Sequence, residues 1–226
     1  MSQHEPLRKI PASRVRALTD AAMAYNSASW LESDYLEARG ISSRSVATFQ
    51  LGVVADPIPG HEIYTGRLAI PYLGLNPDTG ETECWHFKFR CVEDHSCKEA
   101  GHGKYTAQAA PTRMFNVGAI TEAVDEIHVT EGELDAIILN QCGFPAVAIP
   151  GANNWKWHYG RLLAGFNRVY IWGDPDAAGA EFVTTVSNAV RNNSAAVKLD
   201  GGDVNETYLR GGLAALQEAR GAVKWG

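Results

Sequence analysis

Four acidic side chains in the second half of the chain stand at spacings that would gather their carboxylates: Glu131, Asp135, Asp174 and Asp176. Asp135 lies four residues after Glu131, the separation that places two side chains on one face of a helix. Asp174 and Asp176 are two apart and therefore point the same way in an extended chain. Two bare carboxylates about 4 Å apart repel by roughly 4 kcal/mol at a surface-like dielectric, so a cluster favours a bound cation. Oxygen ligands without histidine or thiol indicate Mg²⁺ or Mn²⁺.

These acids also have a simpler interpretation. Glu131 and Asp176 are both well placed to cap the start of a helix, where a carboxylate is favourable. Capping alone explains one acidic turn more readily than two acidic turns that follow neighbouring strands, each with a glycine beside it. The sequence therefore favours a cation site over capping alone.

The elements expected around the acids alternate between strand and helix. Short apolar runs predict strands at 127–129, 146–149 and 168–172, and a helix that begins near Leu134 is expected to stop at Gly143. Strands that alternate with helices at this spacing predict βαβ units and a parallel sheet. Functional groups gather beyond the carboxyl ends of such strands, where these acids stand. We also expect the segments that follow to be a helix at 180–190, a strand at 195–199 and a helix at 207–223 with breaks at Gly211 and Gly212.

The first half predicts helices followed by a strand hairpin. Helices are expected at 13–25, from Trp30 and Leu31 through Tyr35 up to a stop at Gly40, and after a cap at Ser42 or Ser43. Strands are expected at 66–72 and 83–91, joined by a turn at 75–80. The return strand alternates strictly, with Trp85, Phe87 and Phe89 on one side and His86, Lys88 and Arg90 on the other. One face is expected to be core and the other a basic row, although two solvated side chains on an open sheet face would give the same pattern.

Composition limits the class of protein. The chain has 226 residues, of which 45% are hydrophobic, enough for one large globular domain or two small ones. Its formal net charge of −6 counts against tight nonspecific DNA binding unless divalent ions offset the charge. There is no apolar run long enough to span a membrane and no signal-peptide core, and the four cysteines do not form a secreted disulfide framework. We expect a cytoplasmic protein without a membrane partner.

Two motifs resemble those of a known domain. TEGELDA at 130–136 and DPDAAG at 174–179 resemble the Toprim domain, the metal-binding catalytic fold of bacterial-type primases, topoisomerases and some nucleases. A third acidic element, GDVNE at 202–206, lies where primases carry a further acidic stretch. The resemblance implies that Glu131, Asp174 and Asp176 are catalytic. The divalent ions would be held by Glu131, Asp135, Asp174, Asp176, Asp203 and Asn205.

The first half resembles the same primases. YLEARGIS at 35–42 with FQLG at 49–52 is similar to the opening of the polymerase domain of bacterial-type (DnaG-like) DNA primases. GRLAIP at 66–71 and the basic return strand resemble strands that line the template groove, and GKYT at 103–106 resembles the join to the Toprim domain. A second lysine that many primases carry there is represented only by Arg113. The resemblance implies nucleotide or template binding by Arg67, Lys88, Arg90, Lys104 and Arg113.

These resemblances together imply an α/β protein with a Toprim-type parallel sheet and flanking helices, preceded by a smaller mixed α+β primase N-terminal subdomain. The expected division is 1–120 for that subdomain and 121–226 for the Toprim domain with a C-terminal helical segment. The implied activity is metal-dependent synthesis of short RNA primers from ribonucleoside triphosphates on single-stranded DNA. Full primases carry a zinc-binding domain and a helicase or helicase-interaction domain as well. We therefore expect a phage-encoded or split primase, working in a bacterial host's cytoplasm with a zinc-binding module or replicative helicase in trans.

Two alternative functions stay open. A small Toprim nuclease would use the same acids to hydrolyse a phosphodiester, but has no need of the Arg67 strand, the basic return strand or the Lys104 segment. A non-catalytic nucleic-acid-binding adaptor of a split primase accords less well with a sequence that keeps every expected acid.

A separate group of metal-ligand residue types lies in the first half: Cys91, His95, Cys97 and His102. Their spacing differs from the paired C-x₂-C pattern of a structural zinc site. A zinc site and a polar loop with incidental thiols both remain open from the sequence.

Overall fold

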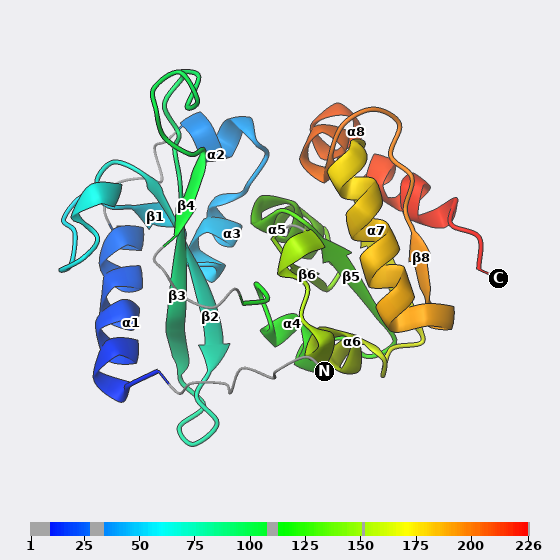
Figure 1. The fold of residues 1–226 in the computed structure, drawn as a ribbon, viewed down its shortest axis with the longest axis horizontal. Helices are drawn as coiled ribbons and strands as arrows, with labels where there is room; N and C mark the ends of the chain where they lie inside the picture. Colours follow the sequence, from blue (N-terminus) through cyan, green and yellow to red (C-terminus); the bar gives the residue numbers. More distant parts are fainter. Residues whose placement is uncertain (1–9, 28–33, 108–112, 151, 226) are drawn as a thin grey trace.

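Two four-stranded sheets frame the part of the chain described by the structure, a computed structural model that covers residues 10–27, 34–107, 113–150 and 152–225 (Figure 1). The first sheet is antiparallel with strand order β1-β2-β3-β4, and the second is parallel with order β6-β5-β7-β8. The expected fold class is confirmed. The boundary between 1–120 and 121–226 stays a prediction. Within the described ranges no helix is long and apolar enough to cross a membrane.

The antiparallel half is built on a long hairpin. Its strands are β1 (Gly52–Val53), β2 (Leu68–Leu75), β3 (Thr82–Arg90) and β4 (Tyr105–Ala107), and its helices are α1 (Ala12–Ser27), α2 (Asp34–Ala38) and α3 (Ser43–Thr48). A short 3-10 turn, Glu62–Tyr64, precedes β2. The predicted helices and hairpin strands are present. The part of the second predicted helix around Trp30 and Leu31 lies outside the described residues.

The parallel half alternates strands with helices, as predicted. Its elements are α4 (Gly118–Glu122), β5 (Glu126–Thr130), α5 (Glu133–Gln141), β6 (Ala146–Ala148), α6 (Trp157–Leu163), β7 (Arg168–Trp172), α7 (Ala177–Val190), β8 (Ser194–Ala196) and α8 (Val204–Gly221). Single 3-10 turns lie at Ala152–Asn154 and Arg191–Asn193. β8 is shorter than the predicted strand at 195–199, because only its three residues pair with β7 before the chain turns toward α8.

Local chemistry sets several of these boundaries. Ser42 caps α3 by accepting a hydrogen bond from the backbone of Ser45. Gly143 takes a φ of +83° just after α5, a left-handed conformation that glycine adopts without strain and that ends the helix. Gly212 has a φ of +61° and breaks α8, as expected from the paired glycines.

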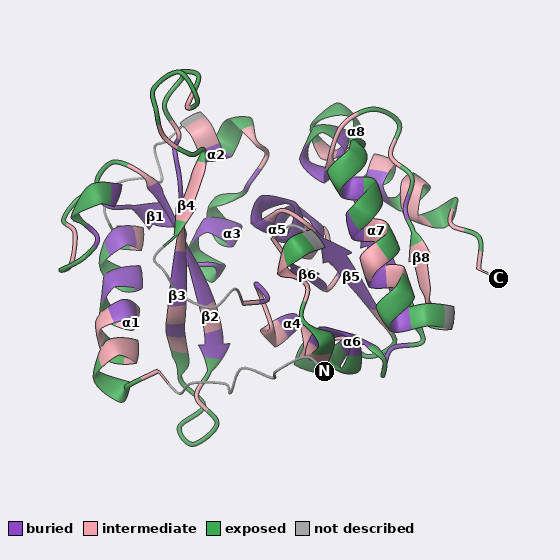
Figure 2. Ribbon diagram, viewed as in Figure 1, coloured by how far each residue is buried: buried purple, intermediate pink, exposed green. Residues whose placement is uncertain are grey.

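Helices cover both faces of the parallel sheet, which is why its strands are apolar on both sides. α6 and α7 pack on one face, in a cluster that includes Val129 and Phe182. α5 and α8 pack on the other face, in a cluster that includes Ile137 and Leu216 and continues into β2 through Ile70. Figure 2 shows the buried strands at the centre of each half. One shared core therefore joins the two halves and fixes how the sheets face each other.

β3 alternates as predicted from His86 to Arg90, and neither of its faces is open to solvent there. The predicted place of Trp85 beside Phe87 and Phe89 is wrong, because a β-bulge shifts the register at Trp85 and Cys84 packs with those two rings instead. Phe87 and Phe89 pack under α1 in a third cluster. On the opposite face His86 and Arg90 are buried and Lys88 is partly buried. The interpretation of this row as solvated side chains on an open face is therefore wrong for His86 and Arg90, because α2 and the parallel half lie over it.

Gly52 lets β1 approach α1 closely. A Cβ at Gly52 would lie 2.1 Å from the backbone oxygen of Tyr25, and backbone has little room to yield. We expect Gly52→Ala to lower the free energy of unfolding by about 1–3 kcal/mol or more through overpacking. The matched control is Gly118→Ala, since nothing lies within 4 Å of that position. Equal denaturation midpoints for both variants would contradict this account of α1 docking.

Candidate functional site

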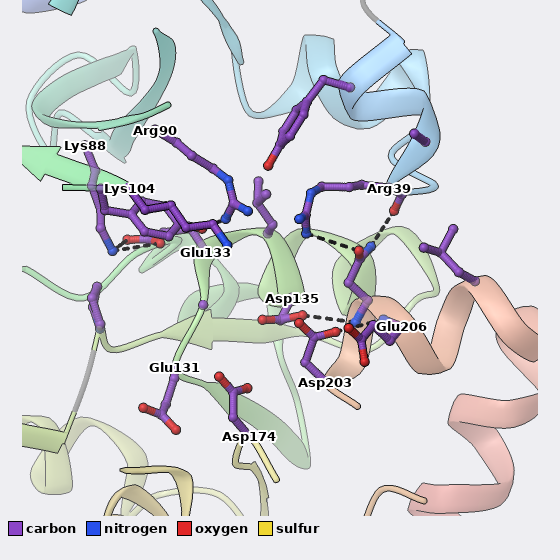
Figure 3. A pocket seen from close by; sticks show the side chains of 18 residues that line it. Arg39, Lys88, Arg90, Lys104, Glu131, Glu133, Asp135, Asp174, Asp203 and Glu206 are labelled. Atoms are coloured by element: carbon purple, nitrogen blue, oxygen red, sulfur yellow. Dashed lines mark hydrogen bonds and ion pairs between the residues drawn. The ribbon is translucent and has the colours of Figure 1, made fainter. Parts of the chain in front are cut away.

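A cleft of about 720 Å³ lies between the two halves, where β5 and β7 end (Figure 3). The parallel half supplies acidic side chains to it, and the turn after α2, β3 and the residue before β4 supply basic ones. The acidic residues are Glu131, Glu133, Asp135, Asp174, Asp203 and Glu206, and the basic residues are Arg39, Lys88, Arg90 and Lys104. The cleft thus lies at the edge of the sheet that the strand pattern predicts.

Strand ends and helix starts place the predicted acids. Glu131 directly follows β5, and Asp174 follows β7 after a single glycine. Asp135 lies in the first turn of α5. Asp203 is the N-cap of α8, where its Oδ1 accepts a hydrogen bond from the backbone of Glu206 at 2.8 Å. The fold therefore brings Glu131, Asp135, Asp174 and Asp203 to one cleft, and the partial positive charge of helix N-termini favours carboxylates there.

Burial and repulsion from neighbouring acids raise the pKa values of Glu131, Asp135 and Asp174. Burial, followed by the charges of Asp174 and Asp176, raises the pKa of Glu131 to about 7. Burial, followed by the charges of Asp203 and Asp174, raises the pKa of Asp135 to about 8. The pKa of Asp174 rises for the same reasons. Since one pKa unit corresponds to about 1.4 kcal/mol, the fully ionised cluster is costly without a compensating cation.

A divalent cation suits this donor set. In the described part of the chain no Lys, Arg or His forms an ion pair with Glu131, Asp135, Asp174 or Asp203. The buried Oε1 of Glu131 has no hydrogen-bond partner among the described residues. The described residues that line the cleft offer carboxylate oxygens but no thiol or imidazole. Such a set matches Mg²⁺ or Mn²⁺ rather than zinc.

Asp176 has a structural partner. It is the N-cap of α7, and its Oδ1 accepts a hydrogen bond from the backbone of Gly179 at 2.8 Å. Its side chain is exposed and lies outside the residues that line the cleft. The capping interpretation is therefore confirmed for Asp176. It is wrong for Glu131, because Gly132 is the N-cap of α5. A role for Asp176 at a metal stays a prediction.

Asn205 ties the two halves together behind the acids. Its Oδ1 accepts a hydrogen bond from Arg39 Nη1 at 3.3 Å, and its Nδ2 donates to the Arg39 carbonyl. Its backbone N–H donates to Asp135 Oδ1 at 3.0 Å. Both ends of the buried amide are thus engaged by α2 and its turn, while the backbone orients Asp135. The predicted role of Asn205 as a metal ligand is untested. To bind a metal, its Oδ1 would have to share its contact with Arg39.

Lys88 pairs with a buried acid. Its Nζ donates to the two carboxylate oxygens of Glu133 at 2.7 and 3.0 Å, and the hydroxyl of Tyr72 donates to the same group at 2.5 Å. The Glu133 side chain has no exposed surface, and that of Lys88 is 18% exposed. This network links β2 and β3 to α5, so it holds the halves in register. A phosphate bound by Lys88, as predicted, would have to share the ammonium group with Glu133.

Arg90 and Lys104 form the basic wall that faces the acids (Figure 3). The guanidinium of Arg90 lies over the rings of Tyr35 and Tyr105, at 5.6 and 4.7 Å from their centroids, and also bonds to the Tyr105 hydroxyl. The nearby charge of Arg90, and then burial, lowers the pKa of Lys104. Two cations held this close create a positive potential suited to a polyanion.

Arg67 and Arg113 lie outside the cleft. Arg67 Nη1 donates to the Gly103 carbonyl at 3.2 Å and lies 3.4 Å from Thr106 Oγ1, so it supports the segment around the start of β4. Arg113 lies near His86, and burial together with the Arg113 charge lowers the pKa of His86 to about 4. Their predicted contacts with nucleotide or template remain untested.

Several residues of the cleft were not identified from the sequence. Glu133 stands between two predicted acids in EGELD, so its position in the first helical turn was an available signal. The side chains of Tyr35, Arg39, Tyr105 and Glu206 also line the cleft. Each of these four stands in a motif quoted above, YLEARGIS, GKYT or GDVNE, which was an available signal, but the motifs alone do not show that the residues meet in one cleft.

Comparisons with known proteins agree with this geometry. Residues 128–208 match the family model described as Toprim-like. Gene 57 protein of Mycobacterium phage D29 is 34% identical over 157 residues, which cover 69% of this chain and 99% of that protein.

Solved primase structures share the fold. The RNA polymerase domain of Mycobacterium tuberculosis primase DnaG, in complex with a double-stranded DNA oligomer with a 6-nucleotide overhang, is 20% identical with a TM-score of 0.71, covering 94% of this chain and 81% of that one. A DNA primase domain from Pseudomonas aeruginosa is 19% identical with a TM-score of 0.68, covering 92% and 78%. The primase fragment of the bacteriophage T7 primase-helicase protein is 22% identical with a TM-score of 0.60, covering 82% and 73%.

The pairing of Lys88 with Glu133 predicts a stability effect. Lys88→Met leaves the Glu133 carboxylate buried without its counter-charge, so we expect the free energy of unfolding to fall by about 3–5 kcal/mol. Glu133→Gln in the same chain removes that charge, and the double variant should recover most of the loss. Urea denaturation of the two single variants and the double variant measures the coupling. Additive losses would show that the pair does not hold the two halves together.

Proposed function

The chain belongs to the same protein family as Gene 57 protein of Mycobacterium phage D29 and has the fold of primase catalytic cores, and on this premise we propose that it is a DNA primase core. The proposed activity is the synthesis of short RNA primers from ribonucleoside triphosphates on single-stranded DNA. One observation carries the proposal: an acidic wall and a basic wall face each other across a single cleft. A nuclease needs the acids alone, whereas a polymerase must also hold a triphosphate.

The acidic wall would hold Mg²⁺ or Mn²⁺ through Glu131, Asp135, Asp174 and Asp203. Asp176 has one oxygen engaged in its cap, so we assign it a weaker contribution from the rim. When bound, the metal ions would supply a lowered pKa for the attacking 3′ hydroxyl and charge stabilisation for the phosphoryl and pyrophosphate groups. Asn205 would hold Asp135 in position through its backbone N–H. We assign Glu131 and Asp174 the central catalytic roles, because both lie at strand ends that face the cleft.

The basic wall would bind the triphosphate. Arg90 is oriented by Tyr35 and Tyr105, so its guanidinium is held before any ligand arrives. Lys104 lies beside it, and a phosphate would relieve the repulsion between these two cations. Preorganised cations of this kind stabilise charge that develops during phosphoryl transfer. Lys88 would act mainly by holding Glu133 and the two halves in register, with contact to phosphate only as a shared donor.

Template and partners follow from the same family relation. The solved DnaG relative is a complex with partly single-stranded DNA, and the bacteriophage T7 relative is part of a primase-helicase protein. We infer that this chain takes a single-stranded DNA template across the cleft. We further infer that a helicase or a zinc-binding module acts with it in trans. A homologue encoded by a mycobacteriophage supports a phage origin.

The direct test is primer synthesis by the purified protein with single-stranded DNA, labelled ribonucleotides and Mg²⁺ or Mn²⁺. We expect short RNA products, and we expect Glu131→Gln and Asp174→Asn each to lower the rate by about 10²-fold or more, since each removes a charge that stabilises the reaction. Asp176→Asn keeps the helix cap and should lower the rate by a smaller factor. Glu181→Gln changes an exposed acid of α7 and serves as the matched control.

Two outcomes would contradict the proposal. Metal-dependent cutting of DNA without primer synthesis, lost in the Glu131 and Asp174 variants, would assign a nuclease. Neither activity, with DNA still bound, would assign a non-catalytic adaptor of a split primase.

A further inference from the structure

Four side chains with metal-binding groups converge in the loop that joins β3 to β4, drawn in green at the top of Figure 1. They are Cys91, His95, Cys97 and His102, and one ligand atom from each lies within 4.8 Å of the others. His95 Nε2 is 3.5 Å from Cys91 Sγ and 3.0 Å from His102 Nε2. Among the described residues, no other group of three or more His, Cys, Asp and Glu side chains has its ligand atoms this close together.

Both histidines turn the same nitrogen toward the centre. His95 Nδ1 lies 3.1 Å from a carboxylate oxygen of Glu93, which can only accept a hydrogen bond when ionised. His102 Nδ1 donates to the Gly103 carbonyl at 3.2 Å. With the proton on Nδ1, a neutral imidazole presents the lone pair of Nε2 to the centre. Outer contacts of this kind are those that orient metal-binding histidines in proteins.

The arrangement requires a positive charge at its centre. Two Nε2 lone pairs 3.0 Å apart repel each other unless a proton or a cation lies between them. A proton would satisfy the two histidines but would not explain why Cys91 and Cys97 point to the same place. With Zn–N near 2.0 Å and Zn–S near 2.3 Å, a tetrahedral site has ligand atoms about 3.3–3.8 Å apart. The separation of 3.5 Å between His95 Nε2 and Cys91 Sγ lies in this range, the 3.0 Å between the two Nε2 atoms is slightly shorter, and no two of the four ligand atoms are more than 4.8 Å apart.

We propose that Cys91, His95, Cys97 and His102 form a structural Zn²⁺ site of the Cys₂His₂ type. Two thiolates and two imidazoles in a tetrahedral arrangement select zinc over Mg²⁺ or Mn²⁺. The site is distinct from the acidic cleft, which has no thiol or imidazole among its described lining residues. Four protein ligands leave no open position for substrate, so the ion has a structural and not a catalytic role.

The zinc site would shape the basic wall. Its loop begins directly after Arg90 and has Lys104 as its last residue before β4, and Cys91 N donates to the Lys104 carbonyl at 2.8 Å. An ion that closes the loop would fix the end of β3 beside the start of β4. The metal would thereby hold Arg90 and Lys104 together against their mutual repulsion. This role does not depend on which reaction the cleft performs.

Metal analysis tests the proposal without any activity measurement. The tag-free protein, purified without chelators, should contain about one zinc per chain by inductively coupled plasma mass spectrometry. The zinc-free protein should take up Co²⁺ and develop thiolate-to-cobalt and tetrahedral absorption bands. Cys97→Ser and His102→Gln should each lower the affinity for the metal by about tenfold or more, because each removes one of four ligands.

Matched variants separate the site from general effects. Cys142→Ser and His158→Gln change a cysteine and a histidine far along the chain from the loop, and should keep zinc and the cobalt bands. Wild-type protein without zinc and without cobalt bands would overturn the proposal, whatever the folding of the variants. A disulfide between Cys91 and Cys97, seen as a mass lower by two hydrogens under non-reducing conditions, would overturn it as well. Equal metal loss in the control variants would do the same.

Discussion

Repulsion between carboxylates is the constraint around which this protein is arranged. The parallel sheet ends its central strands at Glu131 and Asp174, and the neighbouring helices add Asp135 and Asp203. Burial and the charges of Asp174 and Asp203 raise the pKa values of neighbouring acids, and in the described chain no basic side chain forms an ion pair with any of the four. Lys88 does form an ion pair with an acid that lines the cleft, but that acid is Glu133 and not one of these four. A divalent cation is the simplest remaining source of compensating charge.

The basic wall faces the acidic wall because the antiparallel sheet is held against the parallel one. The shared hydrophobic core sets the distance between the halves, while the Lys88 and Glu133 pair and the Asn205 contacts with Arg39 set their register. Breaking a buried pair of this kind leaves an uncompensated charge, so the pair disfavours other arrangements of the two halves. These contacts place a basic wall opposite an acidic one. The proposed zinc site would act in the same way, because it would fix the loop that holds Arg90 and Lys104 in place.

Patterns local in the sequence were sufficient for much of the fold. A continuous apolar run predicted the strand at 168–172 without error, because a strand covered on both faces is buried along its length. Helical spacing of apolar residues predicted the helix that ends before Gly143. The Ser42 cap followed from a single residue type. The acidic turns located the edge of the sheet, since parallel strands end together.

Contacts between distant residues were beyond such patterns. Glu133 lies in a predicted motif, yet only the fold shows that β3 brings Lys88 to it. Asn205 was expected at the metal, which stays a prediction, and only the fold shows that its amide is bonded to Arg39. The convergence of Cys91 and His102 was equally hidden, because their spacing matches no standard zinc pattern and depends on the path of the loop.

Crystals of the protein soaked in Mn²⁺ would show whether the acidic wall binds divalent cations. Diffraction data collected at the manganese absorption edge locate the ion by its anomalous signal. We expect a peak in the cleft, in contact with carboxylate oxygens of Glu131 and Asp174. Well-ordered carboxylates with no peak between them at saturating Mn²⁺, or a peak only elsewhere on the molecule, would contradict this expectation.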